Sequence, residues 1–270
     1  MGALKQRLAR LAADTALAIL QVPPVGRLFD WLALQRRRAI RREVEQRLRA
    51  SGQYGDVVAF GPFQGLKYPP GWADSRFEKI IGAYEAELHP ILQTICATPY
   101  TDIINIGAAE GYYAVGLARA IPTATVHAFE MDSFRRQMCQ TMAELNGVSS
   151  RLRLLGAADI TTLRLLEPRS RPLVVCDCEG AERELLDPSA VPWLATADIL
   201  VEVHDFKIPD ISSTLRHRFA ATHSLQVIPT AGLNYANYPV LKQLTFPEIH
   251  AMVGEERAQL MEWFWLSAKR

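Results

Sequence analysis

The chain has 270 residues, 49% of them hydrophobic and 22% charged, which is enough apolar material for one large core and an appendage. No apolar run reaches transmembrane length, and the four cysteines form no C-x-x-C pair, so we expect reduced thiols in a cytoplasmic protein. The net charge of +1 conceals a net of +7 on residues 1–50, where eleven Lys and Arg stand against four Asp and Glu.

The basic extension, residues 1–50, is predicted to form two helices separated by Pro23-Pro24. Leucines at helical spacing define the first, around Leu4–Leu20, and the second, Leu28–Leu48, carries arginines at 36–38 and 41–42. Such a segment lies on an anionic membrane surface, here the inner face, or docks on an acidic partner. The alternative is a helical cap with a solvated basic face. No nucleic-acid partner is expected, because residues 51–270 hold 19 basic and 25 acidic residues.

Residues 51–98 are expected to form a lead-in hairpin and helix, and residues 99–270 a nucleotide-binding domain. The domain opens with a strand, Thr101–Ile106, a turn from Gly107 to Gly111, and a helix to Ala120. A second strand, Ala124–Phe129, ends at Glu130. An acid about 20 residues beyond a glycine turn is placed to bind the two hydroxyls of a ribose.

The glycine spacing indicates which nucleotide binds. A dinucleotide fold uses G-x-G-x-x-G, whose second glycine admits a pyrophosphate, whereas this turn lacks the middle glycine and has Glu110, which would repel a phosphate. No G-K-[ST] follows, so a P-loop is excluded. The turn therefore favours a nucleoside without phosphates, such as S-adenosylmethionine, over NAD.

Further strands alternate with amphipathic helices, which predicts a Rossmann-like, doubly wound α/β sheet that is mostly parallel. Two late strands suit a reversed terminal strand, so we expect seven strands in all, plus the N-terminal helical extension. The predicted strands are 151–155, 173–176, 197–203, 225–228 and 262–267, and the helices are 133–146, 181–187 and 211–222.

Acidic residues and a histidine follow strands four and five, at the edge where parallel strands present ligands. Asp177, Glu202 and Asp205 are candidate ligands of Mg²⁺ or Mn²⁺, which would lower the pKa of an acceptor hydroxyl and leave His204 as base. Alternatively, His204 acts alone, while Glu202 and Asp205 cap the next helix or form ion pairs.

Two other features at the end of strand four have structural explanations. Glu179 and Glu182 start a helix, where the dipole favours carboxylates. Cys176 and Cys178 are expected to point to opposite faces of the strand end, which suits neither a metal site nor a disulfide.

The run VVCDCEGAERELLDP (Val174–Pro188) resembles the D-x-E-G-x-E signature of FkbM-like class I S-adenosylmethionine-dependent methyltransferases, and LVEVHDF (Leu200–Phe206) resembles their E-x-H element. The segment Ile81–Leu92 is similar to the helix that precedes their cofactor domain. Asn105 departs from the Asp of many relatives, although an amide still accepts a hydrogen bond. Combined with the residue reading, the resemblance implies a catalytic edge of Asp177, Glu179, Glu202 and His204, and cofactor contacts at Asn105, Gly107, Ala108, Gly111, Tyr112, Glu130, Met131, Ala158, Asp159 and Asp177.

These features predict a methyltransferase that uses S-adenosylmethionine to methylate a hydroxyl of a sugar or another small polar metabolite. Its small-molecule acceptor would be a sugar or glycolipid precursor, and a homo-oligomer is left open. The alternatives are a methyltransferase acting on protein or nucleic acid, a nicotinamide enzyme, and a nucleotide-binding protein without turnover. The acceptor depends on loops such as Thr230–Pro247, which carry no diagnostic motif.

Overall fold

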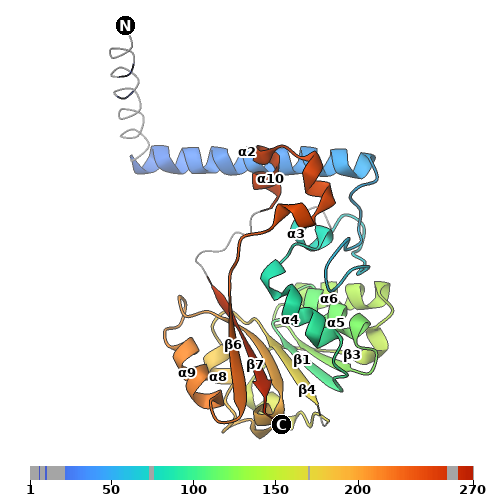
Figure 1. The fold of residues 1–270 in the computed structure, drawn as a ribbon, viewed down its shortest axis with the longest axis vertical. Coiled ribbons are helices and arrows are strands. Elements are labelled where there is room, and N and C mark those ends of the chain that lie inside the picture. Colours follow the sequence, from blue (N-terminus) through green and yellow to red (C-terminus); the bar gives the residue numbers. More distant parts are fainter. Residues whose placement is uncertain are drawn as a thin grey trace. The chain divides into compact units, whose positions relative to one another are not determined.

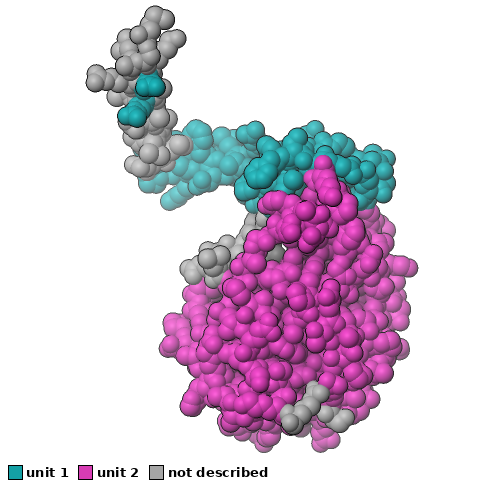
Figure 2. Space-filling model, viewed as in Figure 1, with its two compact units in different colours: residues 1–54, 243–254 teal, residues 55–242, 255–270 magenta. Residues whose placement is uncertain are grey.

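The computed structural model describes residues 6, 10, 22–72, 76–169, 171–253 and 261–269 (Figure 1). The chain divides into two compact units, residues 1–54 with 243–254, and residues 55–242 with 255–270 (Figure 2). Among the described helices, none is long and apolar enough to cross a membrane. The first predicted helix, around Leu4–Leu20, lies almost entirely outside the described residues.

The first unit pairs α2 (Pro23–Ala50) with α10 (Phe246–Met252). Pro23 and Pro24 begin α2, because the first turn of a helix leaves its amides without internal partners. Arg37 and Arg41 donate to the carbonyl of Ala251 at 3.2 and 2.9 Å, near the end of α10, where carbonyls need donors. These arginines therefore hold two segments that are about 200 residues apart in the chain.

The second unit is built on one seven-stranded sheet in the order β3-β2-β1-β4-β5-β7-β6 (Figure 1). The first five strands are parallel, and β7 runs antiparallel between β5 and β6. The predicted doubly wound sheet with a reversed last strand is thus confirmed. The strands are β1 (Asp102–Ile106), β2 (Thr125–Phe129), β3 (Leu152–Leu155), β4 (Pro172–Cys176), β5 (Asp198–Val203), β6 (His223–Pro229) and β7 (Glu262–Ala268).

Helices cover both faces of the sheet, which explains why β1, β4 and β5 are buried at every position and read as nearly continuous apolar runs. Packing from α5 and α6 covers one face, and α7, α8 and α9 enclose the core on the other. The helices are α3 (Phe77–Ile81), α4 (His89–Cys96), α5 (Tyr112–Ala120), α6 (Ser133–Leu145), α7 (Ile160–Leu165), α8 (Glu182–Leu185) and α9 (Ile211–Phe219). Short 3₁₀ turns are η2 (Ala86–Leu88), η3 (Ser149–Arg151), η4 (Pro192–Thr196), η5 (Tyr235–Asn237) and η6 (Pro239–Gln243).

Candidate functional site

The turn after β1 uses glycines where no side chain fits. Gly107 has φ 84°, and a Cβ atom there would lie 1.7 Å from the carbonyl oxygen of Asp177. Gly111 has φ 102°, and its Cβ would lie 2.9 Å from the Sγ of Cys139. Ala109, between them, also has a positive φ of 47°. Because left-handed backbone favours glycine, the two predicted glycines have a steric reason for their places.

Glu130 lies just beyond β2 and is only 6% exposed. Its two carboxylate oxygens accept hydrogen bonds from the amides of Ala109 and Asp132, each at 2.9 Å. A carboxylate oxygen accepts more than one hydrogen bond, so two hydroxyls of a ribose fit beside these amides. The two amides therefore fix the Glu130 carboxylate against the turn after β1.

A pocket of about 240 Å³ opens between the turn after β1 and the turn after β4. Six of the predicted cofactor and catalytic residues line it, namely Gly107, Glu130, Met131, Ala158, Asp177 and Glu179. The rest of its lining is Ile106, Ala109, Phe129, Arg135, Ala157, Cys178, Ala181 and Leu185. The lining thus combines three carboxylates, those of Glu130, Asp177 and Glu179, with the guanidinium of Arg135 and several apolar side chains.

Five predicted cofactor residues do not line the pocket, and four of them lie in β1 or in the turn and helix that follow it. Ala108 and Gly111 shape the turn through their backbone, and Ala108 donates its amide to β2 at 2.9 Å. Tyr112 is 4% exposed and packs edge-on between two aromatic rings. Asn105 donates to a β4 carbonyl at 3.2 Å, and among the described residues its buried Oδ1 has no hydrogen-bond partner.

Asp159, predicted to meet an adenine amino group, caps the N-terminus of α7. Its Oδ1 accepts from the amide and the hydroxyl of Thr162, at 2.6 and 2.8 Å. A carboxylate at a helix N-terminus is favoured by the unpaired amides and the dipole. This capping role uses Oδ1, which is one of the two carboxylate oxygens of Asp159.

Glu110 differs from the sequence-based expectation. Its Oε1 lies 2.6 Å from the Nζ of Lys79 and 3.4 Å from the Nε of Arg76, both in or beside α3. Burial disfavours the charged form of Glu110, but the two cations outweigh burial and lower its pKa to about 2. The expected repulsion of a phosphate was therefore wrong, because these cations neutralise the charge. The missing middle glycine remains as the feature against a dinucleotide.

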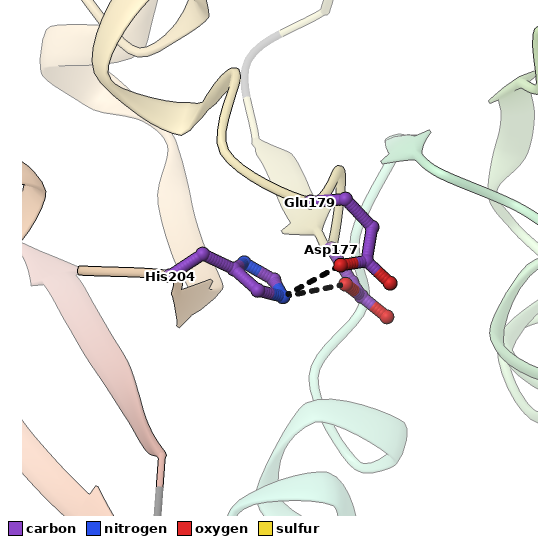
Figure 3. A group of neighbouring side chains, drawn as sticks. All are labelled: Asp177, Glu179 and His204. Atoms are coloured by element: carbon purple, nitrogen blue, oxygen red, sulfur yellow. Dashed lines mark ion pairs between the residues drawn. The ribbon is translucent and has the colours of Figure 1, made fainter. Parts of the chain in front are cut away.

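His204 is surrounded by carboxylates at the carboxyl ends of β4 and β5. Its Nδ1 lies 2.7 Å from the Oε1 of Glu182, and its Nε2 faces three other acids. From Nε2, Asp177 Oδ1 is 3.7 Å away and Glu179 Oε2 is 3.5 Å away (Figure 3). Glu202 Oε2 also lies 3.5 Å from Nε2. The structure thus brings together the predicted residues Asp177, Glu202 and His204.

This environment shifts the pKa values of the group. Burial disfavours the charged imidazole, yet the hydrogen bond to Glu182 and the nearby carboxylates raise the pKa of His204. Burial raises the pKa of Asp177, partly opposed by His204 and by a hydrogen bond with Glu202. For Glu182, burial is outweighed by His204, and its pKa is lowered. An ionised Glu182 that accepts from Nδ1–H leaves Nε2 as the reactive nitrogen.

Glu182 was explained from the sequence as a residue that the helix dipole favours, and the structure gives it a larger role. The side chain is fully buried, and its Oε1 also accepts from the amides of Cys178 and Gly180, at 3.3 and 3.2 Å. It therefore organises the turn after β4, in which Glu179 has φ 62° and turns back toward His204. Its only sequence signal was its place in the D-x-E-G-x-E motif.

The predicted metal trio Asp177, Glu202 and Asp205 is not the group that the structure assembles. Asp205 accepts from the amide of Ser212 at 2.9 Å, in the first turn of α9, so the capping alternative describes it. Glu179 takes its place: one donor atom each from Asp177, Glu179 and His204 lies within 4.8 Å of the others. Lys207 forms an ion pair with Glu179.

The expectation for the cysteines was also wrong. The Sγ atoms of Cys176 and Cys178 lie 3.5 Å apart. Residues two positions apart in an extended strand point to the same face, so thiols on either side of Asp177 at the end of β4 lie on one side of the chain. Both cysteines are free thiols. The contact with Cys178 raises the pKa of Cys176, and burial raises it further.

No protein-family model and no curated protein matches the chain. Similar solved structures include a precorrin-6y C5,15-methyltransferase from Geobacter metallireducens, at 11% identity over 66% of this chain and 88% of that one, with a TM-score of 0.47. The O-methyltransferase of tomaymycin synthesis from Streptomyces achromogenes, in complex with S-adenosylmethionine, has 15% identity over 72% and 86%, with a TM-score of 0.45. An O-methyltransferase from Bacillus cereus, in complex with S-adenosylhomocysteine, has 13% identity over 85% and 91%, with a TM-score of 0.43.

Proposed function

We propose that the protein is an S-adenosylmethionine-dependent methyltransferase of the FkbM-like kind, which methylates a hydroxyl of a sugar or another small polar metabolite. One observation carries the proposal: Asp177 lines the nucleoside pocket and also lies 3.7 Å from the Nε2 of His204. A ligand in the pocket therefore ends at a group of proton-accepting side chains. Methyl transfer needs this juxtaposition, because the sulfonium methyl must meet a nucleophile that loses its proton.

The cofactor would bind through contacts that the pocket already provides. Glu130 is the partner of the ribose hydroxyls, and Met131, Ala158 and Leu185 form apolar walls for the adenine ring. Asn105 does not line the pocket, so its buried Oδ1 would accept from the ammonium of the methionine part only after a local shift. Among the four acids around His204, Asp177 and Glu179 line the pocket.

The acceptor hydroxyl would lie on the other side of Asp177. During transfer, the new O–C bond forms as the S–C bond of the sulfonium breaks, and the hydroxyl proton passes to the cluster formed by Asp177, Glu202 and His204. The excess of negative charge there favours uptake of a proton. A sugar or other small polar acceptor fits better than a nucleic acid, which would need a basic surface beside the site.

Titration calorimetry tests the ligand class. The full chain should bind S-adenosylmethionine and S-adenosylhomocysteine and should not bind NAD. Incubation of a cell extract with methyl-labelled cofactor and the enzyme should then place the label in a small polar product as an alkali-stable methyl ether. Binding of NAD, or label found only in protein or nucleic acid, would contradict the proposal.

We further propose that α2 brings the enzyme to an anionic membrane surface on the cytoplasmic side, where glycolipid precursors are accessible. Leu28, Phe29 and Trp31 are each more than half exposed, which is unusual for large apolar side chains. Arg38 and Arg42 follow Trp31 at seven and eleven residues, so they share its side of the helix and are exposed. In a helix that lies in the interface of a bilayer, large apolar side chains enter the membrane, and arginines beside them keep their guanidinium groups at the level of the headgroups.

Vesicle flotation tests this contact. The full chain should float with anionic vesicles at low salt and detach at high salt, since each basic residue contributes about 1 kcal/mol near such a surface. The double variant Phe29→Ser/Trp31→Ser should lose flotation, and Leu165→Ser, which changes an exposed leucine of α7, should not. Equal flotation of the wild type and the two variants would contradict the proposal and support the alternative, in which α2 is a packed helical cap.

A further inference from the structure

We propose that Asp177, Glu179 and His204 bind a divalent transition-metal ion, of the Mn²⁺ or Zn²⁺ class, at the edge of the cofactor pocket. Figure 3 shows the three side chains converging from the end of β4 and from the residue that follows β5. Their nearest donor atoms all lie within 4.8 Å of one another. The site itself is independent of the proposed reaction, whereas its chemical role, described below, rests on the proposed methyltransferase function.

The spacing of the donor atoms matches a shared ion better than it matches direct hydrogen bonds. The Nε2 of His204 is 3.7 Å from Asp177 Oδ1 and 3.5 Å from Glu179 Oε2. Good N–H···O hydrogen bonds are about 2.7–3.2 Å long. Donors that each lie about 2.0–2.2 Å from one ion at a tetrahedral angle are roughly 3.3–3.6 Å apart. The two distances from Nε2 are therefore close to those expected for a shared ion, and the carboxylate oxygens of Asp177 and Glu179 lie within 4.8 Å of each other.

The histidine is aimed at this point by a separate contact. His204 is 2% exposed, and its Nδ1 is held at 2.7 Å by the fully buried Glu182. Metal-ligating histidines commonly donate their other ring N–H to a carboxylate, which fixes the ring and the tautomer. On the facing side, the buried Oδ1 of Asp177 has no hydrogen-bond partner among the described residues. The oriented Nε2 of His204 and the unpartnered Oδ1 of Asp177 thus face each other across the proposed ion position.

The charge of the surroundings favours a cation. Four carboxylates, those of Asp177, Glu179, Glu182 and Glu202, lie within 3.7 Å of the imidazole nitrogens. The sequence suggested Mg²⁺ or Mn²⁺ because the expected ligands were all carboxylates. An imidazole ligand shifts the preference toward transition ions, so Mn²⁺ and Zn²⁺ should bind more tightly than Mg²⁺.

A cation here would bind the acceptor oxygen and lower the pKa of its hydroxyl. Since the ion occupies the Nε2 of His204, the imidazole becomes a ligand and no longer serves as the base. Glu202 lies beside the ligands, 3.5 Å from Nε2, and is the carboxylate left to accept the hydroxyl proton. The balanced step gives a methyl ether, the neutral thioether S-adenosylhomocysteine and a protonated Glu202.

Metal binding is tested on the full chain without cofactor. Loss of the electron paramagnetic resonance signal of free Mn²⁺ should report one ion per chain, and calorimetry with Zn²⁺ should give the same stoichiometry. Glu179→Gln should weaken Mn²⁺ binding at least tenfold, and folding is not at risk because this side chain is 66% exposed. Lys207→Met should tighten binding severalfold, because it removes the cation that pairs with Glu179.

Glu184→Gln is the matched control, since Glu184 is an exposed carboxylate of α8 outside the cluster. The affinity of this variant for Mn²⁺ should equal that of the wild type. No uptake at millimolar Mn²⁺ and Zn²⁺, or equal affinity of the wild type and Glu179→Gln, would overturn the site. Calorimetry with S-adenosylmethionine on the same protein separates the two proposals. Cofactor binding without metal uptake refutes this site alone, and metal uptake without cofactor binding refutes the methyltransferase alone.

Discussion

The turns after β1 and β4 meet at one edge of the sheet, but their acidic residues have opposite surroundings. Those beside the first turn are paired with cations or amides, whereas those beside the second are crowded around one imidazole. Beside the first, Glu110 is neutralised by Lys79 and Arg76, and Glu130, which follows β2, accepts from two backbone amides. Beside the second, four carboxylates from β5, α8 and the turn itself surround His204. The balanced turn has the properties of a fixed binding surface, and the unbalanced turn has those of a site for chemistry.

Removal of the central imidazole should have the largest effect. His204→Ala should slow methyl transfer by about 10²–10⁴-fold, whether the imidazole accepts the proton or binds an ion, and should leave cofactor affinity nearly unchanged. Steady-state turnover and calorimetry on the same preparation measure both quantities. His217→Ala, an exposed histidine of α9, is the control. Wild-type turnover of His204→Ala would mean that the unbalanced turn is not where the chemistry occurs.

Neutralising Glu110 should instead reduce stability. Its pKa is about 2 in the folded protein and 4.5 ordinarily, so the ion pairs contribute about 3 kcal/mol above pH 4.5, which is lost as the pH falls toward 2. Glu110→Gln should therefore unfold at lower urea concentration at pH 7, and the difference from the wild type should shrink between pH 4.5 and 2. A pH-independent difference, or none beyond that of the exposed control Glu144→Gln, would show that Glu110 is not held by these cations.

Loss of the Asp205 carboxylate should have the smallest effect. Asp205→Ala removes one hydrogen bond to the start of α9 and should cost about 1 kcal/mol of unfolding free energy, with turnover within about twofold of the wild type. Urea unfolding and initial rates measure the two effects. A hundredfold loss of turnover at unchanged stability would restore the metal trio that was expected from the sequence.

The sheet was predictable because its buried strands are short apolar runs that end in glycine or acid, as at Ile106–Gly107 and Phe129–Glu130. Helix α7 was missed, since its six residues are too few to show a helical period. The pairing of α2 with α10 was also missed, because it depends on arginine side chains that reach carbonyl groups about 200 residues away. Contacts of this kind leave no local pattern.

The residue types of the site could be predicted from the sequence, whereas their arrangement in space could be predicted only in part. Asp177 and His204 follow from their places at strand ends, where a parallel sheet presents its ligands. Glu179 joins them through a left-handed turn at φ 62°, which a non-glycine residue rarely adopts and no propensity predicts. Asp205 had both a capping and a metal interpretation, and only the position of Ser212 decided between them.

The central claim is that Glu130 and the turn after β1 bind the nucleoside of S-adenosylmethionine. Calorimetry with this cofactor on the wild type, Glu130→Ala and the exposed control Glu144→Ala tests it most directly. Loss of the charge-assisted bonds to the ribose should weaken binding by about 1.5–3 kcal/mol in Glu130→Ala only. Equal affinity of all three proteins, or no binding to the wild type, would contradict this placement of the cofactor.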